Sequence, residues 1–325
     1  MTLADAFRHA DGTLDDDPWP LVRELAAGGD RSSAAPVRAA MERYAAERNW
    51  YGRDLMAHIL AGLSGADAFP LLLRLYAGAL RGDDDDDGET LGHAVSSAMR
   101  SDPAGCRATI LPLLAGGDPD LRQAAFWALG HVYEPSDMDT LRDALKDPDP
   151  VIRRAALSSL PGVSGDPQAY DLVVTALRDR DDWVRSNAVL LLAWSAPPEV
   201  IDHLLPMVAD PVTHVRSPLG EAIGRRAANS DRAPVASAAL RELLSDPEPS
   251  VRAGAVRGLG MLGLPLDALR PMTDDPDWWV RAAVADVLAV HVRQWPPARP
   301  LLEHLAGDAD PTVRWTAQQA LDRPE

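Results

Sequence analysis

One pattern recurs seven times in the last two thirds of this 325-residue chain: an aliphatic residue, arginine, a small or aliphatic residue three positions on, and leucine or isoleucine four positions later. The steps between successive arginines are 31, 32, 31, 36, 29 and 33 residues, and these anchors are Arg122, Arg153, Arg185, Arg216, Arg252, Arg281 and Arg314. Such a period is typical of stacked repeats, in which no unit can bury its apolar face alone. The sequence therefore predicts an elongated solenoid.

Each repeat is expected to be a hairpin of two helices. If the chain turns 100° per residue, positions −1, +3 and +7 from the anchor share one face, as Val184, Ala188 and Leu192 do. Six positions before most anchors stands an aspartate, generally followed by a turn former, which we interpret as a loop and helix-start signal. A second helix, such as residues 169–179, fills the space between anchors. Pro218 is expected to distort the unit at Arg216.

The recurring D-P-x-x-x-V-R-x-x-A-x-x-x-L motif resembles the HEAT-like repeats of the phycobilin lyase type, over roughly residues 103–325. The resemblance implies an all-α fold, an α-solenoid of two-helix repeats. It leaves the function open, because the same repeat serves scaffolds, chaperone-like binders, lyases and a few enzymes.

Two regions are expected within one continuous solenoid. Residues 1–102 read as helices with irregular anchors, which suits a capping segment, and residues 103–325 hold the seven regular repeats. The run Asp83 to Asp87 is expected to be a solvated loop and not a calcium site, because consecutive aspartates lack the alternating spacing of a calcium loop.

The charge balance limits the classes of partner. With 49 acidic and 32 basic residues the net charge is −17, which repels phosphate backbones and anionic membranes, and no basic stripe offsets it. We expect no nucleic-acid or membrane binding. The chain start lacks the apolar core of a signal peptide, no run approaches the roughly 18 apolar residues of a membrane span, and one cysteine allows no internal disulfide. These features predict a soluble cytoplasmic protein, and the near absence of lysine is typical of GC-rich bacteria.

The anchor arginines are expected to be structural, each bonding the aspartate of its own or the adjacent loop. The face opposite the buried stripe is the candidate binding groove, because exposed tryptophans are frequent anchors of partner surfaces. In proteins that this chain resembles, that face lines a concave groove. Carried over by position, the partner-binding residues are Trp127, His131, Trp183, Asn187, His214, Glu221, Trp278, Trp279, Asp286, Trp315 and Gln319.

Enzymatic signatures are missing from the sequence. It has no H-E-x-x-H helix, no G-x-S-x-G, no phosphate loop, and none of the repeated His-Glu dipeptides of the HEAT-repeat hydroxylases. No catalytic, cofactor-binding or metal-binding residues are therefore predicted, and Cys106 is expected to be a small buried residue.

These features favour a non-enzymatic scaffold or adaptor that binds a protein or peptide in its concave groove, with a basic partner favoured by the acidic surface. Two alternatives stay open. One is a HEAT-like alkylpurine DNA glycosylase, which the chain resembles in concave tryptophans near a carboxylate, with Trp279 and Asp286 in those roles. The other is a bilin-lyase-like or chaperone-like binder of an apolar ligand.

Overall fold

The computed structural model describes residues 2–28, 30–80, 86, 88–163, 165–195, 197–263, 266–292 and 295–322. Packing divides the chain into two compact units, Met1–Leu160 and Pro161–Glu325. The expected change from capping segment to regular repeats after residue 102 concerns sequence regularity, and it stays a prediction. Within the described ranges, none of the helices combines the length and apolar character needed to cross a membrane.

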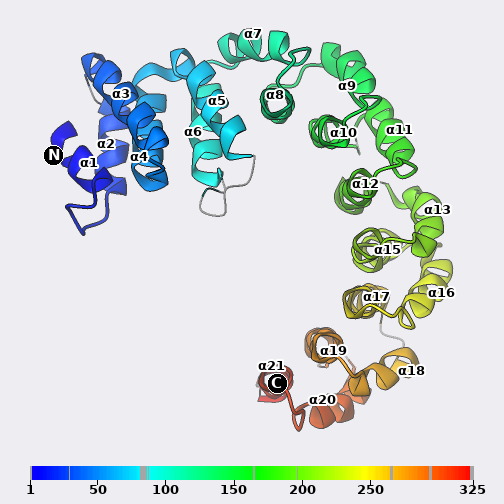
Figure 1. Ribbon diagram of the computed structural model, residues 1–325. Coiled ribbons are helices and arrows are strands. Elements are labelled where there is room, and N and C mark those ends of the chain that lie inside the picture. Colours follow the sequence, from blue (N-terminus) through cyan, green and yellow to red (C-terminus); the bar gives the residue numbers. More distant parts are fainter. Residues whose placement is uncertain are drawn as a thin grey trace. The chain divides into compact units, whose positions relative to one another are not determined.

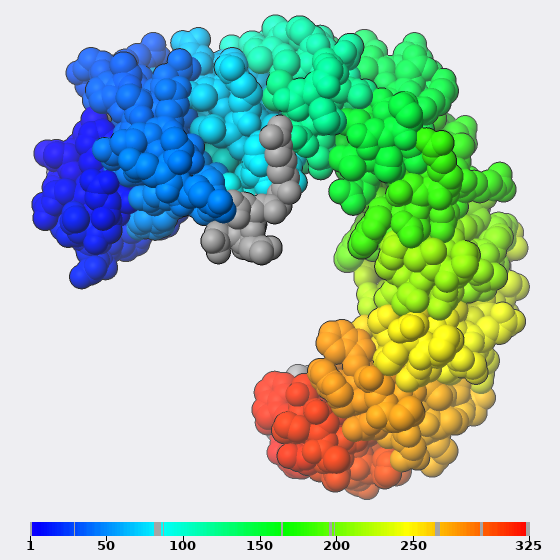
Figure 2. All heavy atoms as spheres, viewed as in Figure 1, coloured from blue at the N-terminus to red at the C-terminus, as the bar shows by residue number. Residues whose placement is uncertain are grey.

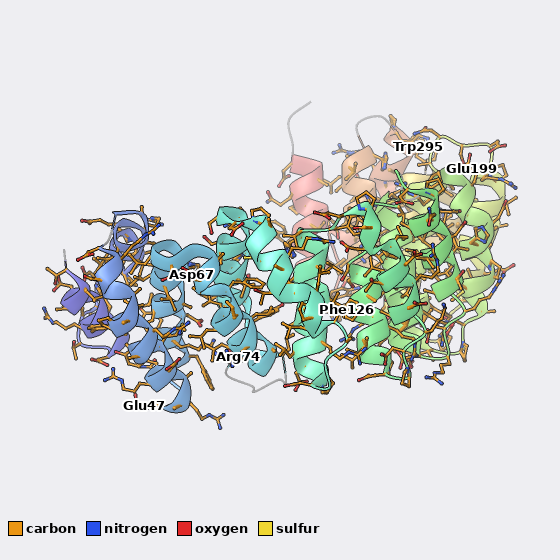
Figure 3. The ribbon with its side chains drawn as sticks, turned by 90° about the horizontal axis from the view of Figure 1, so that it is seen from above. Glu47, Asp67, Arg74, Phe126, Glu199 and Trp295 are labelled. Carbon is orange, nitrogen blue, oxygen red and sulfur yellow. The ribbon has the colours of Figure 1, made fainter. Side chains whose placement is uncertain are left out.

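The N-terminal unit consists of helical hairpins. Its helices are α1 (Leu3–Ala10), α2 (Trp19–Gly28), α3 (Ala34–Ala46), α4 (Trp50–Ser64), α5 (Phe69–Ala79), α6 (Glu89–Ser101), α7 (Pro103–Leu113), α8 (Pro119–His131), α9 (Met138–Ala144) and α10 (Pro150–Ser158), with short 3-10 helices at Arg31–Ser33, Gly65–Asp67 and Pro135–Asp137. Helix α4 packs on α6, and helix α8 packs on α10, while α5 packs on both α6 and α8. Helices α3, α7 and α9 pack on α4, α8 and α10, respectively (Figure 1). Phe126 of α8, labelled in Figure 3, is almost wholly buried in this packing.

The C-terminal unit continues the two-helix plan. Its helices are α11 (Pro167–Ala176), α12 (Asp182–Ser195), α13 (Ile201–Leu204), α14 (Thr213–Arg216), α15 (Leu219–Ala227), α16 (Ala233–Leu243), α17 (Pro249–Met261), α18 (Leu266–Leu269), α19 (Trp278–His291), α20 (Arg299–Leu305) and α21 (Pro311–Asp322), with 3-10 helices at Pro198–Val200, Leu205–Ala209, Arg270–Asp274 and Pro296–Ala298. The expected distortion at Pro218 is confirmed, because it separates α14 from α15.

Two layers make up the C-terminal unit. Helices α12, α15, α17, α19 and α21 pack successively on its concave side (Figure 1). Together with the short α14, which contacts both α12 and α15, we call them the inner layer. Helices α11, α13, α16, α18 and α20 form the outer layer (Figure 1). The predicted all-α solenoid is thus confirmed in each unit.

The predicted apolar stripe forms the core between the layers. Val184, Ala188 and Leu192 are fully inaccessible, and the corresponding residues of the other repeats are also buried, except for Leu121, Leu160 and Leu321, which are half-buried. Because these side chains are mostly valine, alanine and leucine, neighbouring helices approach closely, and burial of their apolar area stabilises each contact between repeats.

Helices α15 and α17 are in direct backbone contact. A Cβ atom at Gly258 would lie 2.1 Å from the carbonyl oxygen of Gly220, and one at Gly224 would lie 2.5 Å from the Cα atom of Gly258. A Cβ atom at Gly254 would lie 2.8 Å from the carbonyl oxygen of Ser217. The two backbones therefore touch at a place where alanine no longer fits.

The aspartates that cap the helices do not stand six positions before the anchor, as the sequence predicted. The side chain that caps a helix stands four positions before the anchor: the Oδ1 atoms of Asp149 and Asp277 accept hydrogen bonds from the backbone N–H groups of Val151 (2.9 Å) and Trp279 (2.8 Å). The aspartate six positions before the anchor, such as Asp147, instead organises the loop that precedes the helix.

The predicted arginine ladder is confirmed. In the C-terminal unit, Arg185 donates from Nε (2.7 Å) and Nη2 (3.0 Å) to the carboxylate of Asp210 in the next loop. Its Nη1 donates to the carbonyl oxygen of Asp179 in its own loop (2.9 Å). The same carboxylate contact recurs in Arg216–Asp246, Arg252–Asp275, Arg281–Asp308 and, in the N-terminal unit, Arg122–Asp147. Each arginine thereby joins two consecutive loops.

Replacing Arg185 by alanine should lower the free energy of unfolding by about 2–4 kcal/mol, because the largely buried carboxylate of Asp210 loses its partner. Urea denaturation followed by circular dichroism measures this loss. The matched control is Arg241→Ala, which removes the exposed Arg241–Asp267 pair and should cost less than about 1 kcal/mol. Equal effects of the two substitutions would contradict a structural role for the ladder.

The ladder also sets the acid stability. Burial alone would raise the pKa of Asp210, but the guanidinium of Arg185 and the backbone N–H of Val212 lower it below the ordinary value. The pKa values of Asp147, Asp246, Asp275 and Asp308 are lowered by equivalent contacts. Carboxylates with depressed pKa values in the folded state stabilise it above their unfolded pKa and lose that effect as the pH falls through the folded pKa. We expect the melting temperature to drop steeply below about pH 4; an unchanged melting temperature on further acidification would contradict this.

The prediction of a solvated loop for the run Asp83 to Asp87 is wrong at one position. Asp86 is buried, and its carboxylate binds the equally buried guanidinium of Arg53 and accepts a hydrogen bond from the backbone N–H of Gly88 (3.3 Å). The expectation of a solvated loop is therefore wrong for Asp86, because a buried arginine on α4 requires a carboxylate. Asp83, Asp84, Asp85 and Asp87 lie outside the described residues.

Candidate functional site

The candidate site is the exposed side of the inner layer, which we call the inner surface. Three rows of residues form most of it, at positions −2, +5 and +9 from the anchor arginines of the C-terminal unit, and Asn187, Trp278 and Trp315 stand beside these rows. The rows hold Trp183, His214 and Trp279; Leu190, Glu221, Arg257, Asp286 and Gln319; and Trp194, Arg225, Met261 and Val290. Figure 2 shows the concave edge of this unit in profile.

Five of the nine tryptophans are exposed, and all five lie on inner-layer helices. Their exposed fractions are 56% for Trp183, 68% for Trp194, 42% for Trp278, 47% for Trp279 and 66% for Trp315. Burial of the stripe at −1, +3 and +7 turns these positions away from the core, so the exposure predicted from the repeat register is confirmed. Their role in binding is not tested by this exposure.

At the α12 end of the inner surface, the indole of Trp183 stacks on the imidazole of His214, with ring centroids 4.2 Å apart and planes 16° apart. His214 Nε2 lies 3.6 Å from Asp182 Oδ1. Ser186, next to the anchor Arg185, is buried and donates a hydrogen bond to the carbonyl oxygen of His214 (3.0 Å), although its helix position predicts exposure. Asn187, one turn after Trp183, is half-buried.

Charged side chains occupy the middle of the inner surface. Arg257 Nη1 lies 3.5 Å from Glu221 Oε1, and its guanidinium carbon lies 5.8 Å from the centroid of the Trp279 ring. Asp286 is on α19, two turns after Trp279. Although more than a third of Asp286 is exposed, partial burial raises the pKa of its carboxyl, and the positive charge of Arg257 acts against this rise.

Two further aromatic groups border this centre. Trp278 and Trp279 contact edge to face at 5.6 Å, and on α21 the exposed side chains of Trp315 and Gln319 lie one turn apart. Trp194, at position +9 on the same face, lies beneath Arg225, whose guanidinium carbon is 4.2 Å from the indole centroid. The inner surface thus combines indole faces with arginine and carboxylate groups.

Trp127 and His131 lie in the N-terminal unit, apart from the other nine predicted residues. The half-buried indole of Trp127 packs between the rings of Tyr76 (4.5 Å) and His131 (4.6 Å). Tyr76 is not among the predicted residues, because the anchors before residue 103 are irregular and give no register. The predicted residues therefore fall into two local groups, one in each unit.

The described residues contain neither an activated thiol nor a cluster of metal ligands. Cys106 is buried as predicted, and burial raises the pKa of its thiol to about 11, which disfavours the nucleophilic thiolate. In the part of the chain that the structure describes, no three histidine, cysteine, aspartate or glutamate side chains are grouped as metal ligands.

Comparison with known proteins agrees with this architecture. The family model for HEAT repeats matches residues 79–161, 138–224 and 237–322, which together make up more than half of the chain. One curated relative, the uncharacterized phycocyanin operon protein Z of Pseudanabaena tenuis (strain PCC 7409), is 26% identical over 224 residues, covering 67% of this chain and 94% of that protein.

Among solved structures, the Kap95:Nup1 complex contains a chain with a TM-score of 0.55 and 12% identity; the match covers 97% of this chain but 48% of that one, about half its length. The complex of CpcE and CpcF of phycocyanin lyase from Nostoc sp. PCC7120 gives a TM-score of 0.43 and 21% identity, over 66% of this chain and 86% of that one. At 12% identity the likeness to the chain of the Kap95:Nup1 complex concerns the fold alone. From the repeat pattern, the packing and the family match, we conclude that this chain belongs to the family of HEAT-repeat proteins.

Proposed function

We propose that the chain is a non-enzymatic scaffold or adaptor that binds a protein or peptide partner on the inner surface of its C-terminal unit. The observation that carries this proposal is the gathering of the five exposed tryptophans on α12, α19 and α21. A repeat protein exposes such large apolar side chains at an energetic cost, and Trp is among the residues that most often anchor partner surfaces.

The inner surface has apolar side chains that would provide contact area and polar side chains that would orient a bound partner. Trp183, Trp279 and Trp315 supply broad apolar faces. Polar groups beside them, namely Asn187, His214, Glu221, Asp286 and Gln319, would fix the register of a bound segment through hydrogen bonds and charge pairs. The net charge of −17 favours a basic partner, because complementary charge speeds encounter.

Site-specific photo-crosslinking tests the location of the partner. A partner is first identified by affinity capture and mass spectrometry, and a photoreactive residue then replaces either Leu190 on α12 or Val235 on α16, which are 43% and 49% exposed. We expect the identified partner to crosslink at position 190 and not at position 235. Crosslinking at position 235 alone would place the partner on the outer layer and overturn the proposal.

A second candidate function is binding of an apolar ligand, such as the conjugated rings of a tetrapyrrole, between the exposed indoles, since the similarity to the phycocyanin operon protein covers 67% of this chain. Biliverdin is a suitable probe. Under this alternative it should quench tryptophan fluorescence saturably, and Trp183→Ala and Trp279→Ala should weaken that binding. Under the proposed adaptor function the quenching should not saturate.

DNA glycosylase activity is the enzymatic alternative, with Trp279 and Asp286 in the roles that the resemblance gives them. We expect no binding to duplex DNA at about 0.15 M salt and no release of alkylated purines, because the net charge opposes contact with phosphates. A gel-shift and base-release assay measures both. Base release that disappears in Asp286→Asn would favour the glycosylase function over the adaptor function.

A further inference from the structure

Arg314 on α21 is a ladder arginine to which no carboxylate of the described residues is bound. Its Nη1 donates to the carbonyl oxygens of Asp308 and Ala309 in its own loop, both at 2.7 Å, as Nη1 of Arg281 does in the preceding repeat. Arg281 then binds the carboxylate of Asp308 in the following loop through Nε and Nη2. The own-loop contacts thus hold Arg314 as in the other repeats, while its Nε and Nη2 have no carboxylate within the described part of the chain.

Arg314 belongs to an exposed side of α21, which we call the C-terminal end face and which also carries Trp315 and Gln318. The equivalent positions of α17 hold Ala253 and Val256, which are fully inaccessible in a helix that packs against α19. On α21, by contrast, Trp315 is 66% exposed and Gln318 is exposed as well. The end face therefore presents to solvent the positions that α17 buries between repeats.

The loop before α2 carries an aspartate of the ladder type, Asp17. Its Oδ1 accepts a hydrogen bond from the backbone N–H of Trp19 (3.1 Å), as Oδ1 of the ladder residue Asp210 does from Val212 (2.9 Å). Residues 17–23 follow the D-P-x-x-x-V-R pattern of the repeats, and α2 packs on α4. Asp17 is exposed, and no basic side chain of the described ranges forms an ion pair with it. We call this loop and α2 the N-terminal end face.

The two end faces are complementary in charge and in direction. In the ladder, each arginine binds the aspartate of the loop that follows it along the stack. A second copy placed after α21 in the same direction would bring its Asp17 to Arg314 of the first copy, so donor and acceptor would keep the order that they have within one chain. Asp15 and Asp16 add negative charge beside Asp17. A guanidinium with two free donors forms a strong and directional pair with such a carboxylate.

We propose that the chain self-associates head to tail, with Arg314 of one copy paired with Asp17 of the next copy. Because two different faces meet, the contact is heterologous and allows more than two copies to assemble. Trp315 supplies apolar contact area, whereas Gln318 and Asp322, which hydrogen-bond to each other (2.9 Å), keep the face polar, so the association is reversible. Each end face is defined by its own unit alone, and the contact does not depend on partner binding at the inner surface.

Sedimentation velocity of the full chain over a range of concentrations tests this contact. The experiment uses about 0.15 M salt, which screens the repulsion between copies of net charge −17. We expect the sedimentation coefficient of the parent to rise with concentration. Asp17→Asn, which keeps the acceptor for the N–H of Trp19, and Arg314→Gln should each weaken self-association at least about tenfold, because a charge-assisted pair is lost. A parent chain that stays monomeric up to about 1 mM would overturn the proposal.

Mixing the two variants tests the direction of the contact. Between them, Asp17→Asn and Arg314→Gln retain one intact Arg314 and one intact Asp17, so an equimolar mixture should form a complex of one copy of each with parental affinity for that contact. A mixture that associates no more tightly than the single variants would contradict head-to-tail pairing. Trp315 is left unchanged in these variants because it also borders the inner surface.

The matched control is Arg299→Gln on α20, which breaks the exposed pair of Arg299 with Glu303 and should self-associate like the parent. Circular dichroism melts show which variants are folded. If Arg314→Gln does not fold, Asp17→Asn still decides, because parental self-association of that folded variant would overturn the proposal. Loss of self-association in Arg299→Gln to the same extent would also contradict a specific role for the two end faces.

Discussion

Replacing Gly258 by alanine should lower the free energy of unfolding by at least about 2 kcal/mol, even though alanine is the better helix former by about 0.5–1 kcal/mol. The added Cβ atom would lie 2.1 Å from the carbonyl oxygen of Gly220 and 2.8 Å from its carbonyl carbon. Both are backbone atoms, so only a displacement of α15 from α17 can make room. Urea denaturation monitored by circular dichroism measures the loss.

Gly78→Ala is the matched control. Gly78 also lies within a helix, α5, but a Cβ atom there meets no other atom within 4 Å. This substitution should therefore stabilise the protein by about 0.5–1 kcal/mol, through helix propensity alone. If Gly258→Ala and Gly78→Ala shifted stability in the same direction, the contact between the two helix backbones would not be as close as described.

The close packing of α15 against α17 also matters for the inner surface. It brings Glu221 of α15 within ion-pair distance of Arg257 of α17, and Arg257 in turn reaches the Trp279 ring on α19. A variant that separates the helices should break this chain of contacts. The stability of the repeat contact and the arrangement of the candidate site are therefore coupled.

The repeat architecture could be predicted because its determinants are local and recur. The spacing of Val184, Ala188 and Leu192 around Arg185 defines a helix face within a few residues, and the recurrence of the same spacing shows that such faces stack. The aspartate at −6 and the arginine anchor recur in the same register, so their ion pairs across loops could be inferred as well. The exposure of Trp183 and Trp279 follows from the same register.

Other features depend on contacts between distant segments and could not be predicted. The pairing of Asp86 with Arg53 joins residues 33 positions apart without a repeated pattern. The contact of Gly220 with Gly258 can be recognised only when the two helices are placed side by side. Two glycines four residues apart also occur in helices that make no such contact, so their spacing alone does not predict it. The packing of Tyr76 against Trp127 involves a helix before residue 103, where no register identifies facing residues.

Substitution of the inner-surface tryptophans should have the second large effect, on partner affinity. Trp183, Trp279 and Trp315 come from three helices and are exposed, so replacing each by alanine should change the free energy of unfolding little. Anchor residues of this type contribute about 1–4 kcal/mol each when truncated, which corresponds to roughly 5- to 1,000-fold in the dissociation constant. Tyr51→Ala in the N-terminal unit, where the side chain is 51% exposed, is the control for general loss of an exposed aromatic ring.

The most direct test of the proposed function is the dissociation constant of the captured partner, measured by isothermal titration calorimetry for the parent, the three tryptophan variants and Tyr51→Ala. Thermal melts run alongside show which variants are folded. The inner-surface proposal predicts weaker binding for the folded variants Trp183→Ala, Trp279→Ala and Trp315→Ala, and parental affinity for Tyr51→Ala. Parental affinity in all three folded tryptophan variants would contradict it.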